Sequence, residues 1–351
     1  MNIDYIIVGC GLAGIAFAET CLQHNKSILV FENNSQTSST IAAGLYNPVI
    51  LKRFTGLENA QQQIDLLNVF YKSIEQKLKV KVDYKIPILR KFFSIEEQNN
   101  WFVASDKPDL TSFLSLDLIK TKFKGIDSPF DFGEVLQTGF VDTATLLKTY
   151  RNYLIKNNSL IIDSFQYENL LINVDHIKYK EFKCNHIIFA EGFSIHFNPF
   201  FNNLPLDGTK GELFIIKTPN LNLDVIINTS FFILPLGDNL YKVGATYNWH
   251  DKTNIPTHEG KLELIERIKE ILNCDFEIIE HFAGVRPTVK DRKALIGTHH
   301  KFKNMHILNG LGTRGVMLAP TMAKNLFDFI ELGKPLNQSI NIERFYKKMN
   351  F

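Results

Sequence analysis

The feature that most constrains the fold is a glycine-rich turn between a buried strand and a helix near the start of the chain. Residues 4–8 (Asp-Tyr-Ile-Ile-Val) form the continuous apolar run that is typical of a strand buried on both faces. The run leads into the turn 9–14, and the small and apolar side chains of residues 12–22 predict a helix that packs closely on a sheet. A second buried strand is predicted over 27–31, so this segment predicts a parallel βαβ unit.

Each glycine of this turn has its own physical role. Gly9 permits the tight turn, Gly11 lets the backbone approach a pyrophosphate, and Gly14 lets the helix pack closely on the strand. The start of the helix supplies unpaired N–H groups and a partial positive charge. Glu32 follows the second strand, where a carboxylate accepts hydrogen bonds from ribose hydroxyls and disfavours a 2′-phosphate. The unit therefore predicts FAD or NAD as ligand and argues against NADP.

The middle of the chain has a different pattern from its two ends. Further helices are predicted over residues 61–78, 143–156, 262–272 and 315–330, and a further buried strand over 184–190. Antiparallel strands are predicted over residues 212–217, 231–234 and 241–247, with a hairpin turn at 237–239. A chain of 351 residues suits two domains. We therefore predict an α/β fold (α+β overall), with a Rossmann-like domain assembled from discontinuous segments and a second domain built on an antiparallel sheet.

Charge and cysteine usage exclude several classes of protein. The formal net charge is only +2, which argues against a dedicated nucleic-acid binder. The cysteines form no CxxC pair and give neither a disulfide framework nor a zinc site, so no metal is expected. The histidines have no metal-binding spacing, and His299, His300 and His306 are expected in loops or at the surface.

The hydrophobic runs are too short for a membrane protein. No apolar stretch reaches the length of about 20 residues that spans a bilayer. The first residues, Met-Asn-Ile-Asp, lack the positive flank of a signal peptide. We therefore expect a soluble, cytoplasmic protein.

The last third of the chain carries a more specific pattern. It contains Gly-Val-Arg-Pro-Thr at 284–288, Leu-Ile-Gly at 295–297, and a glycine-rich segment at 307–320. Together with the N-terminal glycines and Ala-Ala-Gly at 42–44, this combination resembles the D-amino-acid oxidase superfamily of FAD enzymes, which includes glycine oxidase. The stretches 312–315 and 44–48 also resemble the flavin domain of the bifunctional enzyme that matures wobble uridines in tRNA.

The resemblance implies a set of residues that bind FAD. The helix start at 312–316 would direct N–H groups at the flavin pyrimidine oxygen, where charge develops on reduction. No cysteine follows Cys274 and no histidine lies between His24 and His176, so non-covalent FAD is expected. The implied cofactor residues are Gly9, Gly11, Gly14, Glu32, Ser39, Thr40, Ala43, Gly44, Val174, Gly192, Gly312, Thr313, Arg314, Gly315 and Val316.

The resemblance also implies candidate catalytic residues. Arg286 matches the arginine that pairs with a substrate carboxylate, a planar group that guanidinium grips with two hydrogen bonds. The alternative is a structural ion pair. Arg314 either serves the substrate or caps nearby carbonyl groups. Phenylalanines at 231–232 stand where members of the family often have a substrate-binding tyrosine. Tyr46 or Tyr247 could take over this role, or both could have only a packing role.

The implied reaction is oxidation of the C–N bond of an amino acid or related amine. The α-hydrogen leaves as hydride to the flavin, and the imine is then hydrolysed. The expected partners are a small amine substrate and O2 or a quinone as electron acceptor. The alternatives are a flavoenzyme of tRNA wobble-uridine maturation, with nucleic acid as partner, and a non-catalytic flavin-binding subunit of a complex. We assign residues 1–76, 138–198 and 284–351 to the FAD-binding domain, and 77–137 and 199–283 to the substrate-binding domain.

Overall fold

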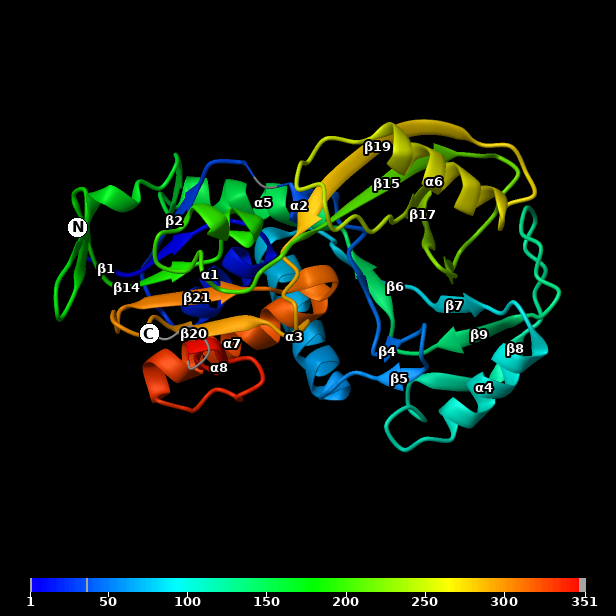
Figure 1. Cartoon of the computed structure of the whole chain (residues 1–351), viewed down its shortest axis with the longest axis horizontal. Coiled ribbons are helices and arrows are strands. Elements are labelled where there is room, and N and C mark those ends of the chain that lie inside the picture. The colour runs from blue at the N-terminus through cyan, green and yellow to red at the C-terminus, as the bar shows by residue number, and fades with distance from the viewer. Residues whose placement is uncertain (1, 36, 347–351) are drawn as a thin grey trace.

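The predicted βαβ unit is present at the start of the chain (Figure 1). The computed structural model describes residues 2–35 and 37–346. Strands β1 (Asn2–Val8) and β2 (Ile28–Glu32) are parallel neighbours, with Tyr5 opposite Ile28, and helix α1 (Leu12–Gln23) connects them. Tyr5 and Ile7 pack into one hydrophobic cluster and Ile6 and Val8 into another, on opposite faces of the sheet. Burial on both faces explains why the strand is apolar without alternation.

Strands from two more distant parts of the chain complete this first sheet. The path runs β11-β2-β1-β14-β13-β12, and β21 pairs with both β14 and β20. The added strands are β11 (Leu160–Ile162), β12 (Leu170–Ile172), β13 (Ile177–Tyr179), β14 (Phe182–Phe189), β20 (Leu295–Thr298) and β21 (Met305–Asn309). The pairs β1–β14 and β14–β21 are parallel, so the carboxyl ends of these strands meet at one edge. Such an edge is the usual place of a dinucleotide in this type of sheet.

Helices cover the face of this sheet that carries Tyr5 and Ile7. They are α1, α3 (Ala60–Leu78), α5 (Thr143–Lys156) and α7 (Gly315–Leu332), and their apolar side chains share one hydrophobic cluster. Gly333 ends α7 with a φ of 65°, a conformation that favours glycine at the end of a helix. Among the described residues, no helix is long and apolar enough to cross a membrane.

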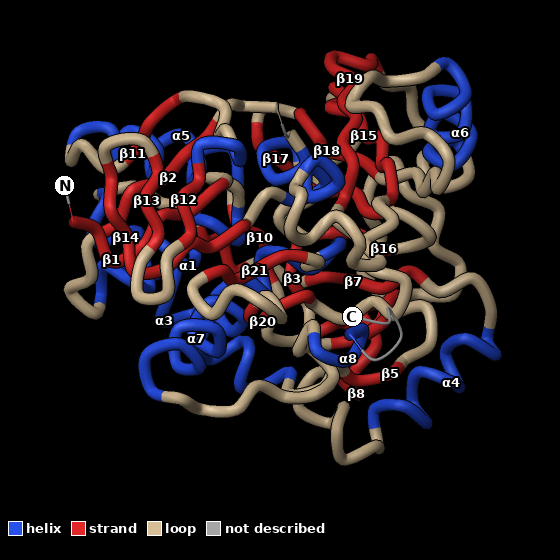
Figure 2. Tube along the Cα trace, turned by 60° about the vertical axis from the view of Figure 1, so that its left-hand side comes forward, coloured by secondary structure: helices blue, strands red, loops and turns tan. Residues whose placement is uncertain are grey.

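A second eight-stranded sheet lies beside the first (Figure 2). Its strands, in spatial order, are β19 (Glu277–Arg286), β15 (Thr209–Lys217), β18 (Leu240–Gly244), β17 (Phe232–Gly237), β16 (Ile226–Asn228), β7 (Ile88–Lys91), β9 (Phe132–Val135) and β8 (Leu114–Ile119). Only β16 and β7 pair in parallel. The predicted hairpin turn joins β17 and β18, and Gly237, Asp238 and Asn239 all have positive φ.

The remaining elements are short or peripheral. The other helices are α2 (Ser38–Ile41), α4 (Ile95–Ser105), α6 (His258–Lys269) and α8 (Glu343–Tyr346), with single 3₁₀ turns at η1 (Tyr167–Asn169), η2 (Gly192–Phe197) and η3 (Gly312–Arg314). Small sheets contain β3 (Leu45–Tyr46), β10 (Gly139–Val141) and β6 (Asp83–Lys85), and β4 (Val49–Ile50) with β5 (Thr55–Gly56). The domain boundaries given above stay a prediction, and β19 runs without a break across the one at residues 283 and 284.

The expectation for the histidines was wrong for His306. This residue lies in the central strand β21 and is buried, because the strand has sheet neighbours on both sides. Its imidazole lies 3.1 Å from His186 Nδ1 and 2.8 Å from Thr298 Oγ1, and burial lowers its pKa well below the usual value. His299 is also buried. Across residues 2–35 and 37–346, no group of histidine, cysteine or acidic side chains could hold a metal ion.

Candidate functional site

A cavity of about 1940 Å³ opens between the two sheets. Its wall includes the glycine turn after β1, the segment that begins at α2, the ends of β14 and β19, and the start of α7. Sites for small molecules usually measure about 300–1,000 Å³. The cavity therefore has room for a dinucleotide and a second, small molecule.

The glycine turn leaves no space for side chains, so a dinucleotide could approach its backbone closely. A Cβ on Gly14 would lie 1.9 Å from Gly9 O, and a Cβ on Gly11 would lie 3.0 Å from Ser39 Oγ. Gly9 has a φ of 100°, which favours glycine. Helix α1 begins at Leu12, whose N–H donates to Ser39 Oγ at 3.3 Å, and residues 11–13 at this helix start line the cavity. Gly14 lies behind this surface and serves the helix–strand packing.

Glu32 is fixed against the glycine turn. Its carboxylate accepts hydrogen bonds from the backbone N–H groups of Cys10 and Asn34, both at 2.7 Å. Arg151 of α5 pairs with it at 3.2 Å and also donates to the Cys10 carbonyl oxygen. The carboxylate therefore stands at the cavity wall, where its remaining lone pairs can accept from a ribose. No local sequence motif marks Arg151, so its role was not predicted from the sequence.

A second group of predicted residues, Ala43 and Gly44, lies farther along the cavity. Gly44 has a φ of 72°, and a Cβ there would lie 1.9 Å from Val141 O, so this position needs glycine. Lys242 of β18, which the sequence analysis also missed, donates to the carbonyl oxygens of Ile41 and Ala42 at 3.3 and 3.1 Å. Burial lowers the pKa of Lys242. The side chain anchors the end of α2 to the second sheet.

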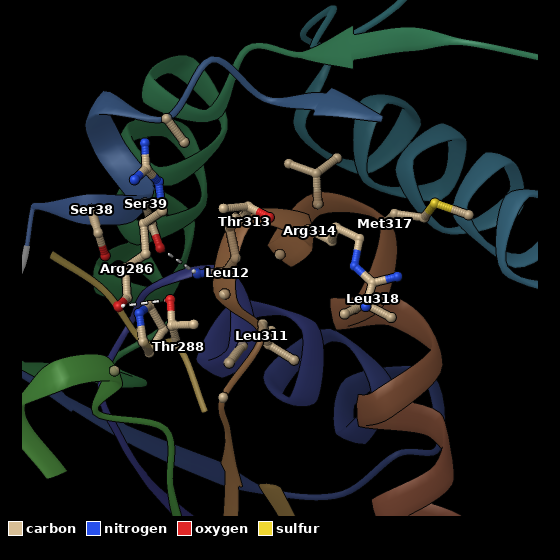
Figure 3. A pocket seen from close by; sticks show the side chains of 18 of the residues that line it. Leu12, Ser38, Ser39, Arg286, Thr288, Leu311, Thr313, Arg314, Met317 and Leu318 are labelled. Carbon is tan, nitrogen blue, oxygen red and sulfur yellow. Dashed lines mark hydrogen bonds between the residues drawn. The ribbon is translucent and has the colours of Figure 1, made fainter. Parts of the chain in front are cut away.

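The predicted helix start at 312–316 faces the same cavity (Figure 3). Gly312 has a φ of 57°, and a Cβ on Gly315 would lie 3.1 Å from Leu12 Cδ1. The starts of α1 and α7 are therefore close together. Arg314 is the N-cap residue of α7 and makes no side-chain capping bond, and residues 312–318 at this helix start line the cavity.

Arg286 projects into the cavity from the end of β19. Its guanidinium lies over the ring of Tyr247, 4.7 Å from the centroid, and Nη1 donates to Thr246 O at 3.3 Å. A Cβ on Gly211 of the neighbouring strand β15 would lie 1.9 Å from Nη2, so this glycine makes the space for the guanidinium. Burial lowers the pKa of Arg286, and within the described residues no carboxylate pairs with it. The alternative of a structural ion pair therefore finds no support.

Arg314 lines another part of the cavity wall. Figure 3 shows its side chain beside Met317 and Leu318 of α7, whereas Arg286 lies beside Thr288. Burial lowers the pKa of Arg314, and no acidic side chain of the described chain opposes this effect. The two arginines thus reach one cavity from different elements.

The two candidate tyrosines differ in their surroundings. Tyr46 is buried, and its hydroxyl donates to Asp83 at 2.8 Å and accepts from Lys85 at 2.8 Å. Its polar end is therefore already paired, which favours a packing role. Tyr247 is 56% exposed and stacks on Arg286.

The structure separates Val174 and Thr40 from the other predicted cofactor residues. Val174 is 92% exposed in the turn between β12 and β13, because this edge hairpin carries the turn into solvent. It does not line the cavity, so the structure does not bring it together with the other predicted residues, and its assignment to the adenine stays a prediction. Thr40 is exposed on α2 and also lies off the wall, whereas Ser38 and Ser39 line it.

Glu191 is a half-buried acidic residue at the cavity wall to which no sequence motif assigned a role. It follows β14 next to Gly192, which has a φ of 58° at the cavity wall. Its side chain accepts hydrogen bonds from Tyr167 Oη and from Asn198 Nδ2, the latter at 2.7 Å. Burial raises the pKa of Glu191 to about 7.

Comparison with known proteins identifies relatives over the whole length of the chain. Residues 4–328 match the model of a family described as FAD dependent oxidoreductase (DAO). Glycine oxidase from Bacillus subtilis (strain 168) is 21% identical over 371 residues, which cover 95% of this chain and 94% of that protein. The tRNA 5-methylaminomethyl-2-thiouridine biosynthesis bifunctional protein MnmC from Legionella pneumophila (strain Corby) is 20% identical and covers 98% of this chain. The match spans only 57% of that bifunctional protein.

Solved structures show the same fold. L-proline dehydrogenase from P. horikoshii superimposes with a TM-score of 0.77 at 13% identity, covering 99% of this chain and 98% of that one. Glycine oxidase from Geobacillus kaustophilus gives a TM-score of 0.74 at 15% identity, covering 96% and 97%.

Proposed function

The chain belongs to the DAO family of FAD-dependent oxidoreductases, and from this premise we propose that it oxidises the C–N bond of an amino acid or related amine. The observation that carries this proposal is the guanidinium of Arg286, which is held in the cavity without an acidic partner. A buried cation is costly unless an anion pairs with it. A substrate carboxylate is the group that satisfies Arg286 best, because the planar fork matches it with two hydrogen bonds.

The glycine turn, Glu32 and the start of α7 would hold FAD. The turn and the start of α1 face the pyrophosphate, Glu32 the ribose, and residues 312–316 the flavin ring. FAD, when bound, supplies the acceptor for the hydride that leaves the α-carbon. Cys10 is the one cysteine of the cavity wall, and burial raises its pKa to about 12, which keeps it a neutral thiol. This supports non-covalent attachment.

The protein's own contribution is to orient the substrate. Arg286 fixes the carboxylate, and the ring of Tyr247 limits the positions that the guanidinium can take. A fixed carboxylate places the adjacent α-carbon at one distance from the cavity wall. Because the α-hydrogen leaves with its electrons, no side chain is needed to remove a proton from carbon. The imine is then hydrolysed by water.

The test is anaerobic reduction of the FAD-loaded protein. Glycine, sarcosine, proline and D- and L-amino acids are added in turn, and loss of the flavin absorbance is followed. We expect at least one amine to bleach the flavin, Arg286→Gln to raise the required concentration at least tenfold, and Arg286→Lys to restore part of the loss. Lys324→Gln is the matched control, because Lys324 lies on the exposed face of α7 and pairs with Asp328.

The opposite result has a clear meaning. If no amine bleaches the flavin and Arg286→Gln leaves the binding of acetate unchanged, the proposal fails and a non-catalytic flavin-binding subunit becomes the better description. Adding air or a soluble quinone to the reduced protein tells whether O2 or a quinone serves as electron acceptor.

Maturation of tRNA is a second candidate, and one observation favours it. Exposed aromatic side chains and cations line the same cavity, namely Phe93, Phe197, Trp249, Lys52 and Arg53. Single-stranded nucleic acids bind through stacking on aromatic rings and through phosphate contacts to cations. For this function we expect tRNA to bind at physiological salt and the double variant Lys52→Gln/Arg53→Gln to weaken binding. A lack of binding by fluorescence anisotropy would exclude it.

A further inference from the structure

Of the arginines that line the cavity, Arg286 and Arg314 are the two partly buried ones without an acidic partner among the described residues, and only Arg286 has been given an anion. Arg286 lies at the end of β19 and Arg314 at the start of α7. Neither is opposed by a carboxylate within residues 2–35 and 37–346, and burial lowers the pKa of both. A partly buried cation without an anionic partner is costly, so Arg314 needs an anion for the same reason as Arg286.

The two groups lie at different parts of the wall. Figure 3 shows Arg314 beside Met317 and Leu318, on the far side of Thr313 from Arg286. A carboxylate held by Arg286 keeps further lone pairs, but they can meet a second guanidinium only if it lies within hydrogen-bond distance of the same oxygen atoms. Arg314 is thus left for a different anionic group of the same or another ligand.

A second observation concerns the polar atoms along the same wall. Arg314, Leu318, Thr321 and Asn325 follow helical spacing, so one face of α7 lines the cavity. Thr321 Oγ1 on this face and Gln63 Oε1 on α3 are buried polar atoms without a hydrogen-bond partner in the described chain, and both residues line the cavity. Gln63 is only 8% exposed. Buried polar atoms without partners are rare in native proteins, so this wall is suited to a polar ligand group.

The alternative role for Arg314 is a cap on nearby carbonyl groups. Its side chain forms no capping bond at the start of α7, and burial is the only influence on its pKa among the described residues. The carbonyl oxygen of Val316, which Pro320 leaves without a donor from the helix, accepts from Tyr71 Oη at 3.0 Å. Arg314 is therefore free to meet a ligand.

We propose that the substrate is an amine with two anionic groups, of which Arg286 binds the carboxylate next to the reacting carbon and Arg314 binds the second. This inference rests on the proposed function and narrows it to dianionic amines, such as amino acids with a second carboxylate.

The test uses binding without turnover. The FAD-loaded protein is titrated with acetate, propionate and butyrate, and with malonate, succinate, glutarate and adipate, and the shift of the flavin absorbance gives each Kd. We expect at least one dicarboxylate to bind about tenfold or more tightly than the monocarboxylates, since an ion pair with two hydrogen bonds supplies that difference. The best chain length reports the separation of the two guanidinium groups.

Single substitutions test which arginine causes the preference for a dicarboxylate. Arg314→Gln should abolish the preference for the dicarboxylate and keep monocarboxylate binding, whereas Arg286→Gln should weaken both. Lys324→Gln removes a positive charge from the exposed face of the same helix and should change neither. Flavin content is measured in each variant, so that weaker binding of the carboxylate can be told apart from loss of FAD.

The inference and the proposed function can fail separately. Equal Kd values for mono- and dicarboxylates, or a preference that survives Arg314→Gln, would overturn the dianion site even if amines bleach the flavin. A preference that depends on Arg314 in a protein that no amine reduces would support the dianion site and contradict amine oxidation.

Discussion

The hydroxyl of Tyr71 in α3 donates a hydrogen bond of 3.0 Å to the carbonyl oxygen of Val316 in the first turn of α7. Pro320, four residues later, has no N–H group, so this carbonyl lacks its partner within the helix. Tyr71 is buried and supplies the missing donor. A residue of α3 thus completes the helix turn whose N–H groups face the cavity.

We predict that Tyr71→Phe lowers the free energy of unfolding by about 1–3 kcal/mol, because the buried carbonyl loses its only donor. Urea denaturation of the FAD-loaded protein measures the change. Tyr153→Phe is the control, since its hydroxyl makes no hydrogen bond within the part of the chain that the structure describes. In a Pro320→Ala background the backbone supplies a donor, so the same substitution should cost less. An equal cost in both backgrounds would contradict this account.

Gly211→Ala should displace the guanidinium of Arg286. The added Cβ would lie 1.9 Å from Nη2, a distance that no contact tolerates. We expect the Kd for acetate to rise about tenfold or more, which corresponds to about 1.4 kcal/mol, while flavin content stays at the wild-type level. The flavin absorbance shift measures both quantities. Unchanged acetate binding would mean that Arg286 does not hold the carboxylate.

Lys242→Met should loosen the segment that precedes Ala43 and Gly44. The variant loses the two hydrogen bonds from Lys242 to the carbonyl oxygens of Ile41 and Ala42 at the end of α2. The bond from Thr143 Oγ1 to the Ala42 carbonyl oxygen remains. We expect FAD to dissociate at least severalfold more readily in equilibrium dialysis. Lys217→Met is the control, because Lys217 is exposed at the end of β15. Equal retention of FAD in the two variants would disprove the role of Lys242.

Glu191 should make stability depend on pH near neutrality. Its folded-state pKa of about 7 lies above the ordinary value of 4.5, so the folded protein binds this proton more tightly than the unfolded chain. The stabilising contribution is complete below pH 4.5 and is lost as the pH rises through about 7. The loss amounts to about 3 kcal/mol.

The comparison of wild type with Glu191→Gln isolates this effect. The variant carries a neutral side chain at every pH, so its advantage in free energy of unfolding should grow between about pH 4.5 and 7 and stay constant above. Urea denaturation across this range measures the difference. A difference that does not change with pH would show that Glu191 titrates at its ordinary pKa.

The sequence by itself determined the βαβ unit, the ends of α1, α5 and α7, and the hairpin between β17 and β18. Each depends on residues within a few positions of one another: the spacing of Gly9, Gly11 and Gly14, the apolar run before them, and the left-handed residue Gly333 after α7. Turn geometry and helix periodicity are local properties of the chain. The sequence pattern therefore predicts them before any tertiary contact is known.

Only the tertiary structure decided which polar groups have partners. Whether Arg286 has an acidic partner depends on how β15 and β19 pair. Arg151 and Lys242, both far away in the sequence, bind Glu32 and the carbonyl oxygen of Ala42. Val174 is exposed because its hairpin lies at a sheet edge. Hydrogen bonds and ion pairs act over a few ångströms between segments that are far apart in the sequence. No local pattern encodes those distances, so they become known only when the sheets are assembled.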